Sequence, residues 1–279
     1  MVAPGVLLGV GSAAAWGSGD FAGGVAARRV GGMLVTGGAQ LVGFVLLLAA
    51  VAVVRPAPPA PATILLGALG GIAGGLGLAA LYRGLAMGAM GLVSAVSGVG
   101  GVLIPLSVGV LLWGNPVQPL QLVGVACALA AVAAASGATT RGVERDAVLL
   151  AVAAALGFGF WFVFLDRAAA HDQLWALVAS RGSASLVIGA AAVLRADRSG
   201  LRAVLPLIGI AGLLDVAANG MVVLSFATIP VGIAAALSGT YPLATMLLAR
   251  TVLGEALPRL GLASVALGVA GIVLISLGG

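Results

Sequence analysis

Long apolar segments recur along the whole chain and restrict its fold more than any other feature. Ten segments of roughly twenty residues occupy 4–26, 33–54, 63–84, 90–113, 119–138, 146–167, 172–194, 203–224, 230–252 and 259–278. Each is long enough to cross a bilayer core about 30 Å thick as a helix. Because they are continuously apolar and do not alternate with a period of two, they predict an all-α membrane protein with ten transmembrane helices.

The composition supports a membrane location. The chain is 62% hydrophobic and 8% charged, whereas soluble domains contain about 25% charged residues. The net charge of +5 comes from arginine alone, and so few charges argue against a nucleic-acid partner. The longest connections have roughly ten residues and leave no room for a soluble domain. We therefore expect a multi-pass protein of the cell membrane whose surroundings are the lipid bilayer.

The two halves of the chain are similar when one is laid over the other at an offset of about 141 residues. Residues 85–98 (LAMGAMGLVSAVSG) then fall on residues 226–239 (FATIPVGIAAALSG), with five identical positions. The repeat predicts two units, residues 1–139 and 140–279. Five crossings return the chain to the opposite side, so the second unit inserts upside down. Such a repeat is typical of transporters, with a binding site near the symmetry axis, and we expect a single chain to be sufficient.

The ends of the two halves resemble a known family. Ser97–Ser136, Ser238–Ser276 and the segment AAWGSGDFAGG (Ala14–Gly24) are similar to EamA-type transporters of the drug/metabolite transporter superfamily. The resemblance implies ten helices in two inverted five-helix repeats, a central cavity and movement of small metabolites, often outward. Asn115 departs from the pattern, because the second half keeps an acidic residue, Glu255, at the corresponding place.

The arginines and the resemblance give opposite orientations. Odd-numbered connections of the ten-helix topology hold Arg28, Arg29, Arg141, Arg145, Arg195, Arg198, Arg202, Arg250 and Arg259, whereas even-numbered ones hold Arg55 and Arg167. The positive-inside rule then places both termini outside the cell. The resemblance implies cytoplasmic termini, so the sequence leaves both orientations open.

Charged and polar side chains at bilayer depth mark surfaces that face the protein interior. Asp20 follows Trp16 by one helical turn, and Asn219 follows Asp215 by one turn, so each pair shares a helix face. These four residues are candidates for a substrate site. The alternatives are structural hydrogen bonds or ion pairs, with Arg28 or lipid headgroups for Asp20 and with an arginine for Asp215.

A second polar pair comes from the repeat. Arg181 falls on Gln40 at the offset of 141, so both halves place a polar side chain at one depth of their second helix. Arg181 is predicted either to contact substrate or to pair with Asp215 or Asp20. Tyr82 is a further candidate, whereas the neighbouring Arg83 lies close enough to the membrane boundary to extend toward it.

Glycine and proline interrupt corresponding apolar segments in the two halves. The sequences SGVGGVLIP (residues 97–105) and SGTYP (residues 238–242) predict bends near the middle of the membrane. Matching interruptions in two halves indicate a binding site. The candidate hydroxyl residues there are Ser94, Ser97, Ser238, Thr240 and Tyr241. Kinked packing between small residues is the alternative.

Aromatic residues differ between the halves. The sixth segment contains Phe158, Trp161 and Phe162 where the first contains Trp16 and Asp20. One cavity wall is thus predicted to be aromatic and the other acidic, which suits an amphipathic or aromatic substrate. A membrane-interface position is the alternative for some of these rings.

These features predict a secondary transporter that moves a small-molecule substrate by alternating access. Export of an amino acid or related metabolite is the leading hypothesis; metabolite uptake and hydrophobic-drug efflux are alternatives, and a channel or enzyme is disfavoured. The single histidine, His171, lies outside any catalytic motif, and no cofactor or metal is predicted. Asp20 or Asp215 could carry a coupled proton, because a carboxylate without a cationic partner can exchange one near neutral pH.

Overall fold

The protein is a bundle of α-helices, seen in a computed structural model that describes residues 3–87, 90–136, 145–195, 199–253 and 259–277. These ranges contain helices and turns, and no strand. The helices are α1 (Ala3–Val30), α2 (Gly32–Val54), α3 (Pro61–Ala86), α4 (Met90–Leu111), α5 (Pro119–Ser136), α6 (Arg145–Ala169), α7 (Gln173–Arg195), α8 (Leu201–Ser225), α9 (Val231–Ser238), α10 (Tyr241–Leu253) and α11 (Arg259–Leu277).

Every apolar segment of the sequence coincides with helix to within a few residues, which confirms the all-α prediction for the described chain. Six helices among the described residues are long and apolar enough to span a membrane. They are Gly32–Val54, Pro61–Leu85, Arg145–Ala169, Gln173–Leu194, Leu201–Ser225 and Val231–Val252. The count of ten crossings stays a prediction.

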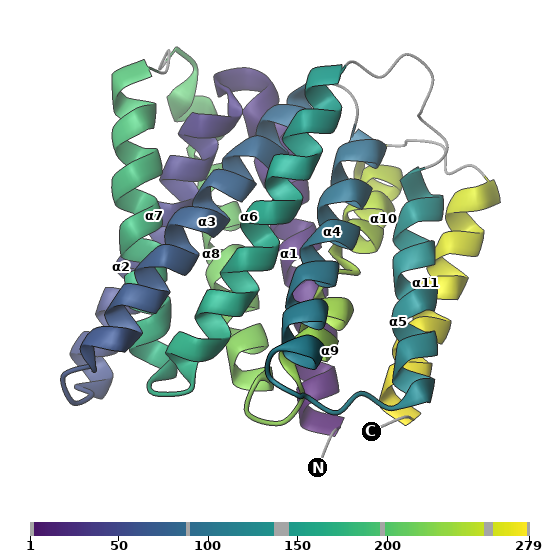
Figure 1. Ribbon diagram of the computed structural model, residues 1–279. Helices are drawn as coiled ribbons and strands as arrows, with labels where there is room; N and C mark the ends of the chain where they lie inside the picture. Colours follow the sequence, from purple (N-terminus) through teal and green to yellow (C-terminus); the bar gives the residue numbers. More distant parts are fainter. Residues whose placement is uncertain (1–2, 88–89, 137–144, 196–198, 254–258, 278–279) are drawn as a thin grey trace.

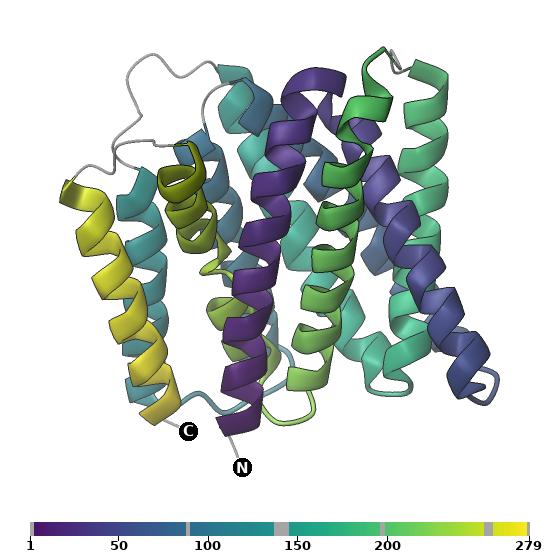
Figure 2. The same cartoon turned by 180° about the vertical axis from the view of Figure 1, so that it is seen from behind.

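Helices of the first half pack mainly on helices of the second (Figure 1). The most extensive pairs are α1 with α8, α3 with α6 and α7, α4 with α6, and α5 with α11. The α5–α11 pair forms one edge of the bundle in both views (Figures 1 and 2). The predicted boundary near residue 140 lies outside the described residues, so the division into two units stays a prediction.

Glycines let several of these pairs approach closely. A Cβ atom at Gly71 of α3 would overlap the carbonyl oxygen of Ser180 in α7, and one at Gly124 of α5 would lie 2.7 Å from the carbonyl oxygen of Gly271 in α11. Small residues replace bulky side chains at such crossings because membrane helices associate by close packing. This packing brings α3 and α7 together beside the cavity described below.

The two Gly/Pro segments differ in the structure: the helix is interrupted at the second copy and continues through the first, where the predicted bend stays a prediction. The second copy breaks at Gly239–Thr240, between α9 and α10, and Pro242 then occupies the first turn of α10, where a missing N–H costs no intrahelical hydrogen bond. Pro105 instead lies inside α4, which stays helical through it. Proline is tolerated within membrane helices when neighbouring groups satisfy the freed carbonyl.

Exposed arginines gather at one end of the bundle. The start of α1 and the end of α11 lie together at the opposite end (Figure 1). The last turns of α1, α3 and α10 and the first turns of α6 and α8 lie at the arginine-rich end, and the last turns of α2 and α6 lie at the other. Among the described residues, the exposed arginines of the first group are Arg28, Arg29, Arg83, Arg250, Arg145 and Arg202, and those of the second are Arg55, directly after α2, and Arg167. The exposure of Arg83 agrees with its predicted position at the membrane boundary.

Candidate functional site

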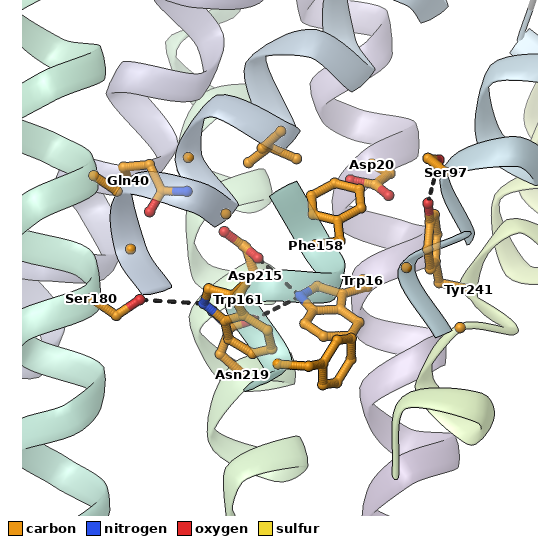
Figure 3. Close-up of a pocket in the computed structure, with 18 of the residues that line it drawn as sticks. Trp16, Asp20, Gln40, Ser97, Phe158, Trp161, Ser180, Asp215, Asn219 and Tyr241 are labelled. Carbon is orange, nitrogen blue, oxygen red and sulfur yellow. Dashed lines mark hydrogen bonds between the residues drawn. The ribbon is translucent and has the colours of Figure 1, made fainter. Parts of the chain in front are cut away.

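A cavity lies between the halves of the bundle, lined from α1, α2, α3, α4, α6, α7 and α8 and from the α9–α10 junction. Figure 3 shows its labelled side chains converging from these helices on one space. The predicted site residues that line it are Trp16, Asp20, Gln40, Ser97, Phe158, Trp161, Arg181, Asp215, Asn219 and Tyr241. These residues come from seven separate segments of the sequence, and the fold brings them together.

Arg181 of α7 is the centre of a polar network on one wall. Its Nη1 atom donates to Oε1 of Gln40 and to Oδ2 of Asp215, each over 2.5 Å. The arginine side chain is 3% exposed and that of Asp215 is 13% exposed. The predicted pairing of Arg181 with Asp215 is therefore present, and both partners also line the cavity. Breaking such a buried pair typically costs about 3–5 kcal/mol, because the remaining charge is left uncompensated.

Trp16 of α1 extends this network. Its indole Nε1 donates to Oδ1 of Asp215 over 2.9 Å and to Oδ1 of Asn219 over 2.8 Å. The one-turn spacing of Asp215 and Asn219 thus places two acceptors on the face of α8 that meets α1, as the sequence predicted. Each oxygen of Asp215 is engaged, one by tryptophan and the other by arginine.

Asp20 occupies a different part of the cavity, toward Ser97 and Tyr241 (Figure 3). It is 8% exposed, and no ion pair of the described residues includes it, in contrast to the predicted pairing with Arg28. Tyr82 of α3 hydrogen-bonds its carboxylate. Gly23, almost one turn after Asp20, has no side chain to obstruct the Tyr82 hydroxyl. Tyr82 itself is outside the cavity lining and supports Asp20 from behind.

Aromatic rings line the cavity next to this polar network. Trp16, Trp161 and Phe162 contact one another edge to face, with ring centroids 5.0–5.9 Å apart. Trp161 also donates its indole N–H to the Ser180 hydroxyl over 3.3 Å. Gly74 makes room for this ring, since a Cβ atom there would lie 2.6 Å from Cδ1 of Trp161. The membrane-interface alternative is wrong for Trp161 and Phe162, which are both buried.

The α9–α10 junction contributes hydroxyl groups. Tyr241 and Ser97 are hydrogen-bonded over 3.0 Å, joining α10 to α4 (Figure 3). Thr240 donates to the Leu237 carbonyl and stabilises the break. Ser238 is fully buried but does not line the cavity. The side chain of Ser94 lies outside the described part of the structure.

Sequence reasoning missed other residues that line the cavity. Ser180 precedes Arg181 and is a polar residue at bilayer depth, a signal that could have identified it. Gly71, Gly74 and Gly75 fit a packing role by their sequence pattern, yet they also line the cavity, as do Gly98, Gly101 and Gly239. A sequence pattern alone does not distinguish a glycine that allows a neighbouring helix to pack closely from a glycine that leaves space for a ligand.

Comparisons with known proteins identify the second half most directly. The model of the EamA-like transporter family matches residues 146–277, which cover α6 to α11. No curated protein matches the chain. Twelve chains of solved structures match it. One of them, titled only as the crystal structure of a protein, has a TM-score of 0.75 and 19% identity over 99% of this chain and 98% of its own. At that identity the likeness shows the fold alone.

Proposed function

We propose that the chain, whose residues 146–277 match the model of the EamA-like transporter family, is a secondary transporter of a small metabolite. It is a multi-pass integral membrane protein, and its family consists of transporters, not enzymes. The observation that carries the proposal is the cavity between the halves, to which both halves contribute side chains. Export of an amino acid or related compound is the leading form, and metabolite uptake or hydrophobic-drug efflux is the alternative.

We further propose that the two halves are inverted repeats around a two-fold axis. The hydrogen bond between Arg181 and Gln40 joins residues 141 apart, which is the offset of the repeat. A residue can contact its own counterpart only near a symmetry axis. Contacts away from the axis should then occur in pairs. Gly17 lies against Thr245, and Gly159 and Ile104 lie against each other; they are the counterparts at an offset of 142 between α1 and α6 and of 141 between α4 and α10.

The same correspondence explains why the two cavity walls differ. Gly19 lies beside Asp215 across the α1–α8 contact, and their counterparts Trp161 and Gly74 meet across the α3–α6 contact. In the first contact the glycine lies in α1 and the charged residue in α8. In the second contact the glycine lies in α3, the counterpart of α8, and the large residue lies in α6, the counterpart of α1. One wall therefore gains a carboxylate and the other an indole. This surface supports an amphipathic substrate with a polar group and an apolar or aromatic portion.

Alternating access would arise from exchange of conformation between the halves. The broken α9–α10 segment and the continuous α4 are counterparts in the repeat and contact each other. In this proposal they exchange roles when the cavity opens to the other side. The break at Gly239–Thr240 is the position where a small change of backbone angle would move α10 relative to α9.

We assign proton coupling to Asp20 instead of Asp215. Both carboxylate oxygens of Asp215 are already engaged, one by Arg181 and the other by Trp16. Asp20 lines the same cavity and forms no ion pair in the described chain. Replacing Asp20 with Asn should abolish stimulation of uptake by a pH gradient in proteoliposomes while leaving exchange without a gradient measurable. If the pH gradient stimulated uptake by the Asp20→Asn variant as strongly as by wild type, Asp20 would not be the coupling residue.

The proposed transport function can be tested with purified protein. A thermal-shift screen against a metabolite panel identifies ligands, because binding to the folded state raises its apparent stability. A ligand found there should show saturable counterflow in proteoliposomes, which separates a carrier from a channel. Trp161→Ala should lower apparent affinity, whereas the control Phe160→Ala, whose ring is 44% exposed on the outer surface, should not. Counterflow that is absent for every ligand would contradict the proposal.

A further inference from the structure

Arg181 retains hydrogen-bonding capacity after its contacts with the protein are counted. A guanidinium group has five N–H donors. Nη1 of Arg181 uses its two on Gln40 and Asp215, but no group in the described chain accepts a hydrogen bond from Nε or Nη2. The residue is 2% exposed, and it lines the cavity. A buried donor without an acceptor lowers stability, so a partner at this place would be favoured.

The geometry holds the guanidinium in one position. Gln40 and Asp215 fix Nη1 from α2 and α8, and the arginine stem packs against α2 at Gly43, where a Cβ atom would be in ordinary contact with Cδ and Nε at 3.5 Å. The remaining Nε and Nη2 donors form the side of the fork that can bind both oxygens of a carboxylate. Because the group is already ordered, a ligand would lose little additional conformational entropy of the protein on binding.

We propose that Arg181 is the recognition site for a carboxylate of the transported molecule, whose apolar ring packs on Trp16, Trp161 and Phe162. This rests on the transport function proposed above and names its substrate class: a small aryl or apolar monocarboxylate. Arg181 is the single arginine among the described cavity-lining residues and has one pair of unused donors, so it can bind one carboxylate. The aromatic cluster adjoins the polar network through Trp16, whose ring contacts Trp161 and whose N–H contacts Asp215.

The carboxylate has two possible chemical sources, one without and one with an adjacent ammonium group. Asp20, on the other side of Asp215 from Gln40 in Figure 3, offers a carboxylate that could accept an ammonium. The simple acid and the zwitterion share the interaction with Arg181. The effect of replacing Asp20 on binding distinguishes the two, and both are included among the probes.

The test measures binding of matched probes to the full chain in lipid nanodiscs. The probes are 3-phenylpropionate, L-phenylalanine and the neutral 3-phenylpropionamide. Wild type should bind at least one of the two carboxylates about tenfold more tightly than the amide, which corresponds to one charge-assisted hydrogen bond. The variant Arg181→Gln with Asp215→Asn neutralises both partners of the buried pair, keeps amide groups for hydrogen bonding, and should lose this preference. Retained amide binding shows that the variant is folded.

A matched control removes an arginine elsewhere. Arg202→Gln changes an exposed residue at the start of α8 and should keep the preference for carboxylate. Loss of L-phenylalanine binding alone in Asp20→Asn would identify the zwitterion as the preferred form, and unchanged binding would identify the simple acid. Equal binding of acid and amide to wild type overturns the inference while leaving the transport proposal intact. If no probe binds, the inference is also overturned, and counterflow with ligands from the metabolite panel then decides the transport proposal separately.

Discussion

At the scale of single residues, Trp16 shows how one donor organises the polar wall. Its indole N–H is shared by Asp215 and Asn219, two residues about 200 positions later in the chain. Trp16→Phe keeps a ring for contacts with Trp161 and Phe162 but removes this donor. We expect a loss of about 1–3 kcal/mol in stability, because two buried acceptors lose their partner. Thermal unfolding in detergent would measure it.

Trp175 provides the matched control for that substitution. Its indole N–H donates to the carbonyl of Ala57 at an exposed position. Water can replace this partner, so Trp175→Phe should change the unfolding temperature much less. Equal effects of the two substitutions would show that the Trp16 hydrogen bonds contribute no more than a surface contact.

The Arg181–Asp215 pair predicts strong coupling between two substitutions. Arg181→Gln leaves Asp215 buried without its cation and should destabilise the protein by about 3–5 kcal/mol. Adding Asp215→Asn to that variant should recover a large part of the loss, because the uncompensated charge is gone. Additive losses in thermal or denaturant unfolding would indicate that the two side chains act independently.

At the scale of elements, close helix contacts depend on particular glycines. Gly71→Ala places a methyl group onto the Ser180 carbonyl oxygen and should separate α3 from α7, with a loss of about 1–3 kcal/mol. Gly209→Ala in α8 meets no atom within 4 Å, and alanine favours helix over glycine by about 0.5–1 kcal/mol. The two variants should therefore shift the unfolding temperature in opposite directions. A fall of similar size in both would show that the α3–α7 contact is not limiting.

The α4 and α9–α10 segments show what sequence can say about an element. Both contain glycine and proline, a pattern that predicts a bend in each. The outcome depended on where proline lies relative to the helix start: within the first turn of α10, but inside α4. The residue at which a helix starts is set by the packing of neighbouring helices around the segment. The local sequence pattern carries no information about that packing.

At the scale of the whole molecule, the arginine distribution makes a prediction about orientation. The end of the bundle that carries six exposed arginines among the described residues should face the cytoplasm, and the start of α1 should then face outward. Single cysteines at Ala60 and at Ala203, introduced after Cys127→Ala, would lie at opposite ends. An impermeant maleimide should label the first in intact cells and the second only after permeabilisation. The reverse pattern would favour the cytoplasmic termini that the family resemblance implies.

The sequence by itself determined the helical segments and the residues that had to face inward. Continuous apolar runs leave no alternative to helix in a bilayer, and polar groups at that depth must avoid lipid. Hydropathy and spacing were therefore sufficient to select Trp16, Asp20, Gln40, Arg181, Asp215 and Asn219.

Only the tertiary structure decided how these residues combine. It joined Arg181 to both Asp215 and Gln40, left Asp20 beside Tyr82, and made some glycines part of a cavity wall. It also showed Ser180 and Phe162 to be lining residues and Tyr82 and Ser238 to lie behind the lining. The physical reason is that each of these outcomes depends on the distance and rotation between helices. Those are set by packing of distant segments, whereas hydropathy and spacing report only on one segment at a time.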